Sequence, residues 1–408
     1  MTLISDKYSN CHSQEIKTWS QIKKGFTHFA ENDIGIAKIT PCFENRKSVI
    51  FKNLKNGFGA GTTELFILRT IYNIIPEYIF WNIKTNRFIQ GGVQTYTGDV
   101  GQQRIQKDYL SKYLIPLPSI VEQQKIIERI QELLLQIDLI EFNDKKLFDS
   151  ISNLKSRILD LAIRGKLVPQ DPNDEAADIL LERIRKEKDE LIKQGKIKRD
   201  KKESIIFKGD DNSYYEKIGN RIELINDFED DLPTQWNLCR FGYIANIFTG
   251  NSINEQEKKS KYINLENGFN YIGTKDIGFN NIINYNNGVK IPFNSCYKIA
   301  PINTTLLCIE GGSAGRKIAI TAEDVCFGNK LCAFQSLGIL PEYVYYYLQS
   351  PQFLQMFKTK TTGLIGGVSI NTIKHIYFKV PPIQEQSRIV NIIEKLFLNI
   401  NQIETSLS

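Results

Sequence analysis

A short loop in the C-terminal half of the chain combines residue types that suit the binding of an anion. The run Gly311-Gly-Ser-Ala-Gly-Arg-Lys317 has glycines that remove side-chain bulk, a serine hydroxyl, and two adjacent cations. Such donors fit phosphate oxygens and the acceptor edges of nucleic-acid bases. Gly312, Ser313, Arg316 and Lys317 are therefore candidate DNA-binding residues. The alternative interpretation is a tight strand-to-strand turn whose Arg-Lys pair is only solvated.

A second loop of this kind lies in the N-terminal part of the chain. The run Pro41-Cys-Phe-Glu-Asn-Arg-Lys47 aligns with the glycine loop. Where aligned positions differ, as Phe43 and Ser313 do, we expect different base preferences if the loops read bases. The candidates in and beside this loop are Lys38, Thr40, Asn45, Arg46 and Lys47, and weaker candidates elsewhere are Lys55, Asn329 and Lys330.

The motifs that enzymatic alternatives require are missing from the sequence. No G-x-x-x-x-G-K-[ST] loop is present to hold ATP, and no N-P-P-[FY] or D-P-P-[FY] element of an amino-methyltransferase occurs. The three histidines, at positions 12, 28 and 375, lack a partner pair at zinc-ligand spacing. These absences argue against the enzymatic alternatives and against a zinc site, and we predict no catalytic residues, no metal site and no cofactor bound by this chain. A cluster of nuclease carboxylates stays an open alternative, although none stands out.

Composition limits the class of protein further. The 408 residues are 41% apolar and 24% charged, which suits two or three packed domains. No run approaches the ~18 uncharged apolar residues of a membrane span, and the start of the chain lacks an export signal. Seven cysteines without a C-x-x-C pair indicate reduced core residues and a cytoplasmic location. Residues 1–117 carry the whole +6 net charge, a weak indication of an acidic partner.

An internal duplication organises the chain. The segment Ile74-Ile-Pro-Glu-Tyr-Ile-Phe-Trp-Asn-Ile83 recurs as Ile339-Leu-Pro-Glu-Tyr-Val-Tyr-Tyr-Tyr-Leu348, an offset of 265. Arg46-Lys-Ser-Val-Ile50 recurs at an offset of 270, and Pro118-Ser-Ile-Val-Glu-Gln123 recurs as Pro381-Pro-Ile-Gln-Glu-Gln386 at an offset of 263. Collinear matches at nearly constant spacing predict two copies of one unit, each an irregular domain followed by a helix.

Both predicted helices carry apolar residues at alternating steps of three and four, a period that demands a helical partner. Ser119 and Glu122 form a capping box, Pro382 suits a first helical turn, and Arg164-Gly165 is a stop signal. We favour pairing of the two helices as an antiparallel coiled coil over packing of each helix on its own domain. The predicted pairing residues are Ile126, Ile130, Leu133, Ile137 and Ile140 in the first helix, and Ile389, Ile393, Leu396, Ile400 and Ile403 in the second.

The rest of the chain is predicted to mix helices and short strands. A further helix is expected to begin at the cap Asp171-Pro-Asn-Asp-Glu175 and to run to about Lys193. A mobile linker is then expected over 195–215. Short apolar runs over 34–39, 65–68, 304–309 and 317–320 are typical of strands, and the Pro-Glu-Tyr segments predict one aromatic core helix per domain. The predicted class is α+β, with two globular mixed domains separated by long helices.

These elements resemble the specificity (S) subunit of type I restriction–modification enzymes. The carriers are Pro118-Ser-Ile-Val-Glu-Gln-Gln-Lys-Ile-Ile127 and Pro382-Ile-Gln-Glu-Gln-Ser-Arg-Ile-Val390, which are similar to the P-x-x-E-Q-x-x-I element that opens each conserved helix in that family. The segments Gly165–Asp174 and Leu232-Pro-Thr-Gln-Trp236 look like its central spacer and the opening of its second recognition domain. The resemblance covers nearly the whole chain.

The resemblance implies a DNA-binding subunit without catalytic activity. Each of two target-recognition domains would read one half of a bipartite site, and the helices would set the spacing and dock two modification (M) subunits, which methylate adenine. Restriction (R) subunits would join that complex. S-adenosylmethionine, ATP and Mg²⁺ would belong to these partners, and the ligand of this chain would be double-stranded DNA.

The predicted domains are 1–117, the first recognition domain; 118–215, central helices and linker; 216–380, the second recognition domain; and 381–408, the C-terminal helix. Compared with the second copy, the first recognition domain is expected to be N-terminally incomplete, because about 40 residues starting at Leu232 have no counterpart in it. The second helix is also expected to be about 20 residues short. Two alternatives stay open: a coiled-coil adaptor that does not read DNA, and an inactive truncated allele.

Overall fold

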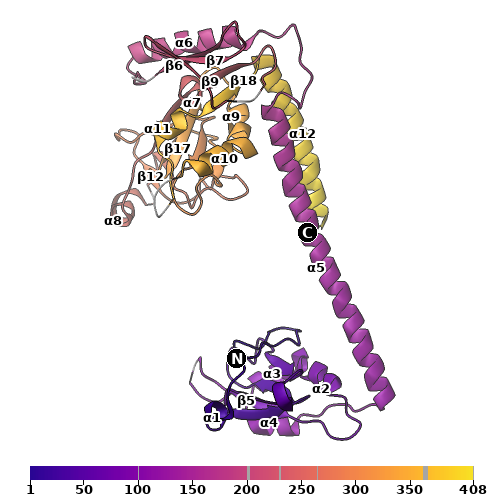
Figure 1. The fold of residues 1–408 in the computed structure, drawn as a ribbon. Helices are drawn as coiled ribbons and strands as arrows, with labels where there is room; N and C mark the ends of the chain where they lie inside the picture. Colours follow the sequence, from indigo (N-terminus) through magenta and orange to yellow (C-terminus); the bar gives the residue numbers. More distant parts are fainter. Residues whose placement is uncertain (100, 200–202, 229–230, 264, 362–365, 408) are drawn as a thin grey trace. The chain divides into compact units, whose positions relative to one another are not determined.

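The computed structural model describes residues 1–99, 101–199, 203–228, 231–263, 265–361 and 366–407 (Figure 1). The chain divides into two compact units, Met1–Lys145 and Lys146–Ser408. Each unit contains hydrophobic clusters of its own. The mixture of helices and short strands confirms the predicted α+β class.

Two small antiparallel sheets form the strand part of the N-terminal unit. Strand β1 (Thr27–Ala30) pairs with β4 (Phe58–Gly61). Strand β2 (Ile34–Ala37) lies between β3 (Ser48–Ile50) and β5 (Leu65–Leu68). All four residues of β2 are buried, because both faces of this strand are covered. The strands predicted near 34–39 and 65–68 are therefore confirmed.

Helices cover one side of these strands. Pro76, with its fixed φ, begins α2, whose Tyr78 and Phe80 are buried, as the predicted aromatic core helix requires. Phe88 of the next helix is also buried. Tyr78 donates a hydrogen bond to the carbonyl of Pro116 at 2.7 Å. The helices of this part are α1 (Trp19–Ile22), the short η1 (Lys55–Gly57), α2 (Pro76–Ile83), α3 (Asn86–Val93) and α4 (Lys107–Lys112).

A buried lysine ties the N-terminal segment to this core. Lys84, at the end of α2, is almost fully buried. Its ammonium donates to the carbonyls of Lys7 at 2.8 Å, Ser9 at 3.0 Å and Arg46 at 2.6 Å. Burial, together with the nearby Arg46 guanidinium, lowers the pKa of Lys84 to about 7.

This pKa makes the stability of the N-terminal unit dependent on pH. Because the pKa of Lys84 is about 7 when folded and 10.5 when unfolded, the unfolded chain binds more protons between these values. We expect the free energy of unfolding to rise by roughly 1–3 kcal/mol from pH 7 to pH 9. Hydrogen exchange of the β3 and α2 amides, corrected for intrinsic rates, measures this rise. Lys84→Met should remove it, and equal slopes for both proteins would contradict the prediction.

Two four-stranded sheets form the centre of the C-terminal unit. The first is antiparallel throughout, and in the second β11 runs parallel to β16. The strands predicted over 304–309 and 317–320 are confirmed. The first sheet has the order β10 (Ala245–Thr249), β17 (Leu331–Ser336), β14 (Thr305–Cys308), β15 (Ile318–Ile320), and the second the order β12 (Lys290–Ile291), β11 (Phe269–Ile272), β16 (Val325–Phe327), β13 (Ile299–Ala300).

Short helices and one strand pair complete this core. The aromatic rings of Tyr343 and Tyr347 on α9 are buried with Phe241 of α7 and Phe378 of β18, which confirms the predicted core role of α9. Strand β18 (Tyr377–Val380) pairs antiparallel with β9 (Asn237–Arg240). The helices are α7 (Phe241–Ile244), α8 (Glu255–Glu257), the π-helical η2 (Lys258–Tyr262), α9 (Pro341–Tyr347), α10 (Pro351–Thr359) and α11 (Ile370–Lys374).

Two predictions for the connecting region are wrong. Helix α6 (Ala177–Lys193) begins after the predicted cap at Asp171, because 171–174 form a turn in which the Asp174 N–H donates to the Asp171 carbonyl and the Asp174 carboxylate pairs with Arg388. The expected linker over 195–215 contains a strand and the start of another. The sheet there has the order β6 (Ser204–Lys208), β7 (Tyr214–Ile218), β8 (Arg221–Leu224).

The long helix α5 (Ile120–Ile163) begins in the N-terminal unit and ends in the C-terminal one. Its predicted start and stop are confirmed. The Glu122 N–H donates to the Ser119 hydroxyl, and Gly165 takes a φ of +66° while its N–H bonds the carbonyl of Ala162.

Within the C-terminal unit, α12 (Ile383–Leu407) lies beside the last part of α5 and runs in the opposite direction (Figure 1). The Lys155 ammonium contacts Asn401 at 3.0 Å and Glu404 at 2.8 Å, near the end of α12. Ile151 and Ile158 of α5 share one buried cluster with residues of α12, of which Ile389, Ile393 and Ile400 are buried, Leu396 is partly buried, and Ile403 lies exposed outside it.

The earlier part of α5 presents its apolar residues differently. Ile126 and Ile130 are half-buried, while Leu133, Ile137 and Ile140 are exposed. These five residues stay a predicted pairing face.

No described helix is both long and apolar enough to cross a membrane. All seven cysteines are free, and Cys11 and Cys296 are exposed, so the prediction of core cysteines fails for these two.

Candidate nucleic-acid interface

The glycine loop of the C-terminal unit is the connection between β14 and β15. The N–H of Cys308 donates to the carbonyl of Lys317 at 2.9 Å and closes the loop, and the Arg316 N–H donates to the Ser313 carbonyl at 3.0 Å. Gly315 has a φ of +73°, a conformation that glycine adopts without cost. A side chain at Gly312 would meet only open space. The loop therefore presents backbone to the surface.

The predicted counterpart in the N-terminal unit is built in the same way. It connects β2 to β3, and the Ala37 N–H donates to the Lys47 carbonyl at 2.9 Å. The Arg46 N–H donates to the Phe43 carbonyl at 2.9 Å, which matches the Arg316–Ser313 turn. Phe43 itself is buried, so the expectation that Phe43 encodes base preference is wrong, because its ring fills the core against Gly92.

A second segment crosses each loop at equivalent positions. In the N-terminal unit the Thr40 N–H donates to the Gln103 carbonyl and the Ile105 N–H donates to the Lys38 carbonyl, both at 2.9 Å. In the C-terminal unit the Gly311 N–H donates to the Gly366 carbonyl at 2.9 Å, and the Val368 N–H donates to the Ile309 carbonyl at 3.1 Å. Each loop is therefore held by the same four backbone contacts, although the side chains differ.

The candidate side chains of the N-terminal loop are partly engaged within the protein. The Arg46 guanidinium donates to the Lys84 carbonyl at 3.0 Å and to the Asn86 side chain. The Lys38 ammonium lies 5.2 Å from the centre of the Phe66 ring. Lys47 is half-buried and Asn45 exposed, while the Thr40 hydroxyl is buried without a partner among the described residues. Arg46 thus holds the loop against the end of α2.

In the C-terminal loop both cations lie close to an exposed ring, and the Arg316 guanidinium also donates to the Gly312 carbonyl. The Arg316 guanidinium lies 5.5 Å and the Lys317 ammonium 5.1 Å from the centre of the Phe279 ring. Lys317 also donates to the carbonyl of Thr274 at 2.9 Å. Phe279 is 64% exposed. An exposed apolar ring beside two cations can stack on a base or wedge between bases while the cations meet phosphate.

The weaker candidates fall at different places. Asn329 and Lys330 are exposed on the turn between β16 and β17, and the Lys330 carbonyl accepts from the Ile309 N–H at 3.0 Å, beside the glycine loop. The exposed Lys55 lies on η1, outside the N-terminal loop.

Two residues beside these loops, Arg104 and Phe279, were not predicted from the sequence. Arg104 donates to both carboxylate oxygens of Glu64, at 2.9 and 3.0 Å, and holds the pKa of that carboxyl below its ordinary value. Glu64 takes the backbone position of Lys330, because its carbonyl accepts from the Lys38 N–H. The 263-residue offset of the repeat aligns Arg104 with Gly367, and this alignment could have identified it. No sequence signal pointed to Phe279.

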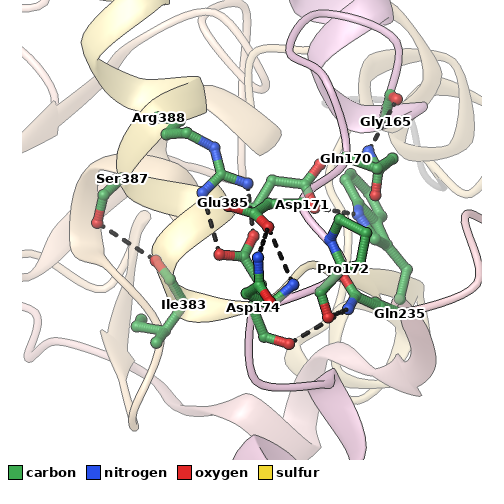
Figure 2. Close-up of polar contacts among 12 residues, drawn as sticks. Gly165, Gln170, Asp171, Pro172, Asp174, Gln235, Ile383, Glu385, Ser387 and Arg388 are labelled. Atoms are coloured by element: carbon green, nitrogen blue, oxygen red, sulfur yellow. Dashed lines mark hydrogen bonds and ion pairs between the residues drawn. The ribbon is translucent and has the colours of Figure 1, made fainter.

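A buried polar cluster joins the start of α12 to the central spacer (Figure 2). The Glu385 carboxylate accepts from the Trp236 indole N–H at 2.9 Å and from Gln170 at 2.7 Å, and burial raises the pKa of this carboxyl. Arg388 donates to both oxygens of Asp174. This cluster fixes the start of α12 against the rest of the C-terminal unit. In the described part of the chain no group of His, Cys, Asp or Glu side chains could hold a metal ion.

Comparisons with known proteins define the family of this chain. Residues 233–408 match the family model described as type I restriction modification DNA specificity domain. The specificity subunit of the type I restriction enzyme EcoAI of Escherichia coli is 30% identical over 99% of this chain and 74% of its own length. That of EcoEI, also from Escherichia coli, is 38% identical over 61% of this chain and 46% of its own length.

Solved structures share the fold. A chain from work on complex assembly and conformational transition of the type I R-M system gives a TM-score of 0.61 at 14% identity, over 94% of this chain and 79% of that one. The HsdS subunit of Thermoanaerobacter tengcongensis gives 0.55 at 14% identity, over 100% and 84%. The chain belongs to the specificity subunits of type I restriction enzymes, which confirms the predicted family.

Proposed function

We propose that this chain reads a bipartite DNA sequence for a type I restriction–modification complex and performs no catalysis itself. Each recognition domain reads one half of the site. The observation that carries this proposal is the pair of equivalent loops, Pro41–Lys47 and Gly311–Lys317, held by matching backbone contacts and bearing donors and cations. A reader of two different half-sites needs a repeated scaffold whose exposed side chains differ.

Matching contacts at the base of each domain support the duplicated unit. The side-chain oxygen of Gln123 accepts from the Ile75 N–H at 3.0 Å, and that of Gln386 accepts from the Leu340 N–H at 3.0 Å. Their amide groups donate to Pro118 at 3.0 Å and to Pro381 at 2.9 Å. Both glutamines are buried. These matching hydrogen bonds support a repeat of the same unit.

The helices carry the second part of the proposal. The Lys155–Glu404 ion pair and the buried isoleucines between α5 and α12 support an antiparallel coiled coil that sets the spacing between the half-sites. We propose that α5 docks partner subunits through exposed apolar residues outside the predicted pairing set, Leu135, Leu139 and Phe142. The partners would be two modification subunits and the restriction subunits, which would bring S-adenosylmethionine, ATP and Mg²⁺.

DNA binding over a series of salt concentrations tests this function. The chain is co-purified with its modification subunit, and binding to genomic duplex fragments is followed from 50 to 200 mM salt. We expect affinity to fall by roughly 10³-fold, because neutralised phosphates release counterions. The modification subunit alone is the control. An intact complex that binds no duplex, or binds without salt dependence, would leave only an adaptor role. A methylome of cells carrying the gene names the half-sites.

A further inference from the structure

Each unit carries an exposed aromatic ring beside the arginine of its candidate DNA-binding loop. In the C-terminal unit this ring is Phe279, whose centre lies 5.5 Å from the Arg316 guanidinium. In the N-terminal unit it is Tyr8, which is 49% exposed and whose ring centre lies 5.2 Å from the Arg46 guanidinium. The two arginines are equivalent in the proposed repeat, at an offset of 270, and the two rings have an offset of 271. The same pair of ring and arginine thus occurs once in each unit.

The turn that carries Tyr8 is held by the core on both sides of this residue. The buried Lys84 ammonium donates to the carbonyls of Lys7 at 2.8 Å and Ser9 at 3.0 Å, the two residues that flank Tyr8. Ile4, at the base of the turn, is buried. The backbone beneath the ring is therefore fixed, although the ring itself is exposed.

The turn that carries Phe279 is also fixed to the core. Ile277 and Ile283 form an antiparallel bridge at its base, and both residues are buried. The Gly278 N–H donates to the Ile282 carbonyl at 2.9 Å across the turn. A ring on a fixed turn loses less conformational entropy on binding than a ring on a loose loop, so both rings are preorganised to contact a ligand.

Exposure separates these two rings from the other rings that lie against a cation. In the described part of the chain those other rings, among them Phe80, Tyr243 and Tyr271, are buried or half-buried, so folding already covers them. A single exposed ring needs no explanation. An exposed ring beside the equivalent arginine of both units, however, indicates a shared role in binding.

The chemistry around the rings fits a base of DNA. An aromatic ring packs on the face of a base or on a thymine methyl group, while neighbouring cations meet phosphate. At Phe279 the Arg316 and Lys317 cations lie within 5.5 Å of the ring centre, and a side chain at the nearby Gly312 would meet only open space. Positive charge and free space beside an apolar ring favour a polyanion with apolar faces, which describes a nucleic acid.

We propose that Tyr8 and Phe279 each place their ring against a base of the half-site that their own domain reads. The ring supplies an apolar contact that carries base preference but neutralises no phosphate. Tyr8 adds a hydroxyl that Phe279 lacks, so the two half-sites should differ at the contacted base. This inference rests on the DNA-reading function proposed above.

Duplexes that carry the methylated site, with one base pair replaced at a time, test these contacts on the complex of this chain with its modification subunit. We expect Phe279→Ala to weaken binding by about 10-fold or more. The slope of log affinity against log salt should stay unchanged, because no phosphate contact is lost. The variant should also become insensitive to the base pair at one position of one half-site. Tyr8→Ala should give the same loss, with the insensitive position in the other half-site.

Two exposed rings elsewhere serve as matched controls. Phe293 is 63% exposed in the C-terminal unit, and Tyr72 is exposed in the N-terminal unit. Neither ring lies against a cation among the residues that the structure describes. Phe293→Ala and Tyr72→Ala should therefore bind every duplex as the native chain does. Because the rings of Tyr8 and Phe279 are exposed, thermal unfolding of their alanine variants should match that of the native chain.

Two results would overturn this inference. The first is native affinity and native base preference for both alanine variants, which would leave the DNA-reading proposal standing. The second is an equal loss of affinity for every duplex with base preference intact, which would mean that the rings contact the DNA backbone or a partner subunit. A native complex that binds no duplex would contradict the proposed function itself, and this result is seen before any variant is compared.

Discussion

Replacing Arg316 and Lys317 together with alanine is expected to weaken DNA binding of the S–M complex by about 30-fold or more, or roughly 2 kcal/mol. Arg316 is exposed and Lys317 is half-buried on this loop, and both cations lie beside the Phe279 ring, where they can meet phosphates or base edges. Loss of two phosphate contacts should also lower the slope of log affinity against log salt by about 2. Fluorescence anisotropy on a duplex that carries the methylated site measures both quantities.

A matched control separates a local contact from a general loss of charge. Lys217→Ala removes a charge from an exposed position of β7 in the same unit and should leave affinity and salt slope nearly unchanged. Because Lys317 donates to the Thr274 carbonyl, thermal unfolding of the double variant must match that of the native chain. A correctly folded double variant that binds DNA with native affinity would exclude this loop from the interface.

Trp236→Ala is expected to lower the free energy of unfolding of the C-terminal unit by about 3–5 kcal/mol. The ring is buried, and its N–H is a donor to the buried Glu385 carboxylate, so the variant leaves both a cavity and an unsatisfied carboxyl oxygen. Trp236→Phe keeps most of the volume but not the donor, and should cost about 1–3 kcal/mol. Urea unfolding followed by circular dichroism measures both changes.

The chain offers a matched tryptophan for comparison. Trp19 is 60% exposed in the N-terminal unit, and Trp19→Ala should change the stability by less than about 1 kcal/mol. If Trp236→Ala were equally mild, the polar cluster around Glu385 would not hold the start of α12 against the rest of the C-terminal unit.

Helix ends and core faces followed well from sequence, because their signals are local. The N-cap at Ser119 and the stop at Gly165 depend on hydrogen bonds between residues a few positions apart. The aromatic periodicity of α2 and α9 likewise identified buried rings. The prediction of a helix start at Asp171 failed because Arg388, far away in sequence, recruits Asp174 into an ion pair.

By itself the sequence determined the α+β class and the family, and it predicted the repeated unit, because repeats and local periodicity can be read without coordinates. Only the tertiary structure decided which loop residues remain available to DNA. It buried Phe43, tied Arg46 to α2, and brought Phe279 and Arg104 beside loops from which they are distant in the chain. These outcomes depend on long-range packing and strand pairing, for which a single sequence carries no local signal.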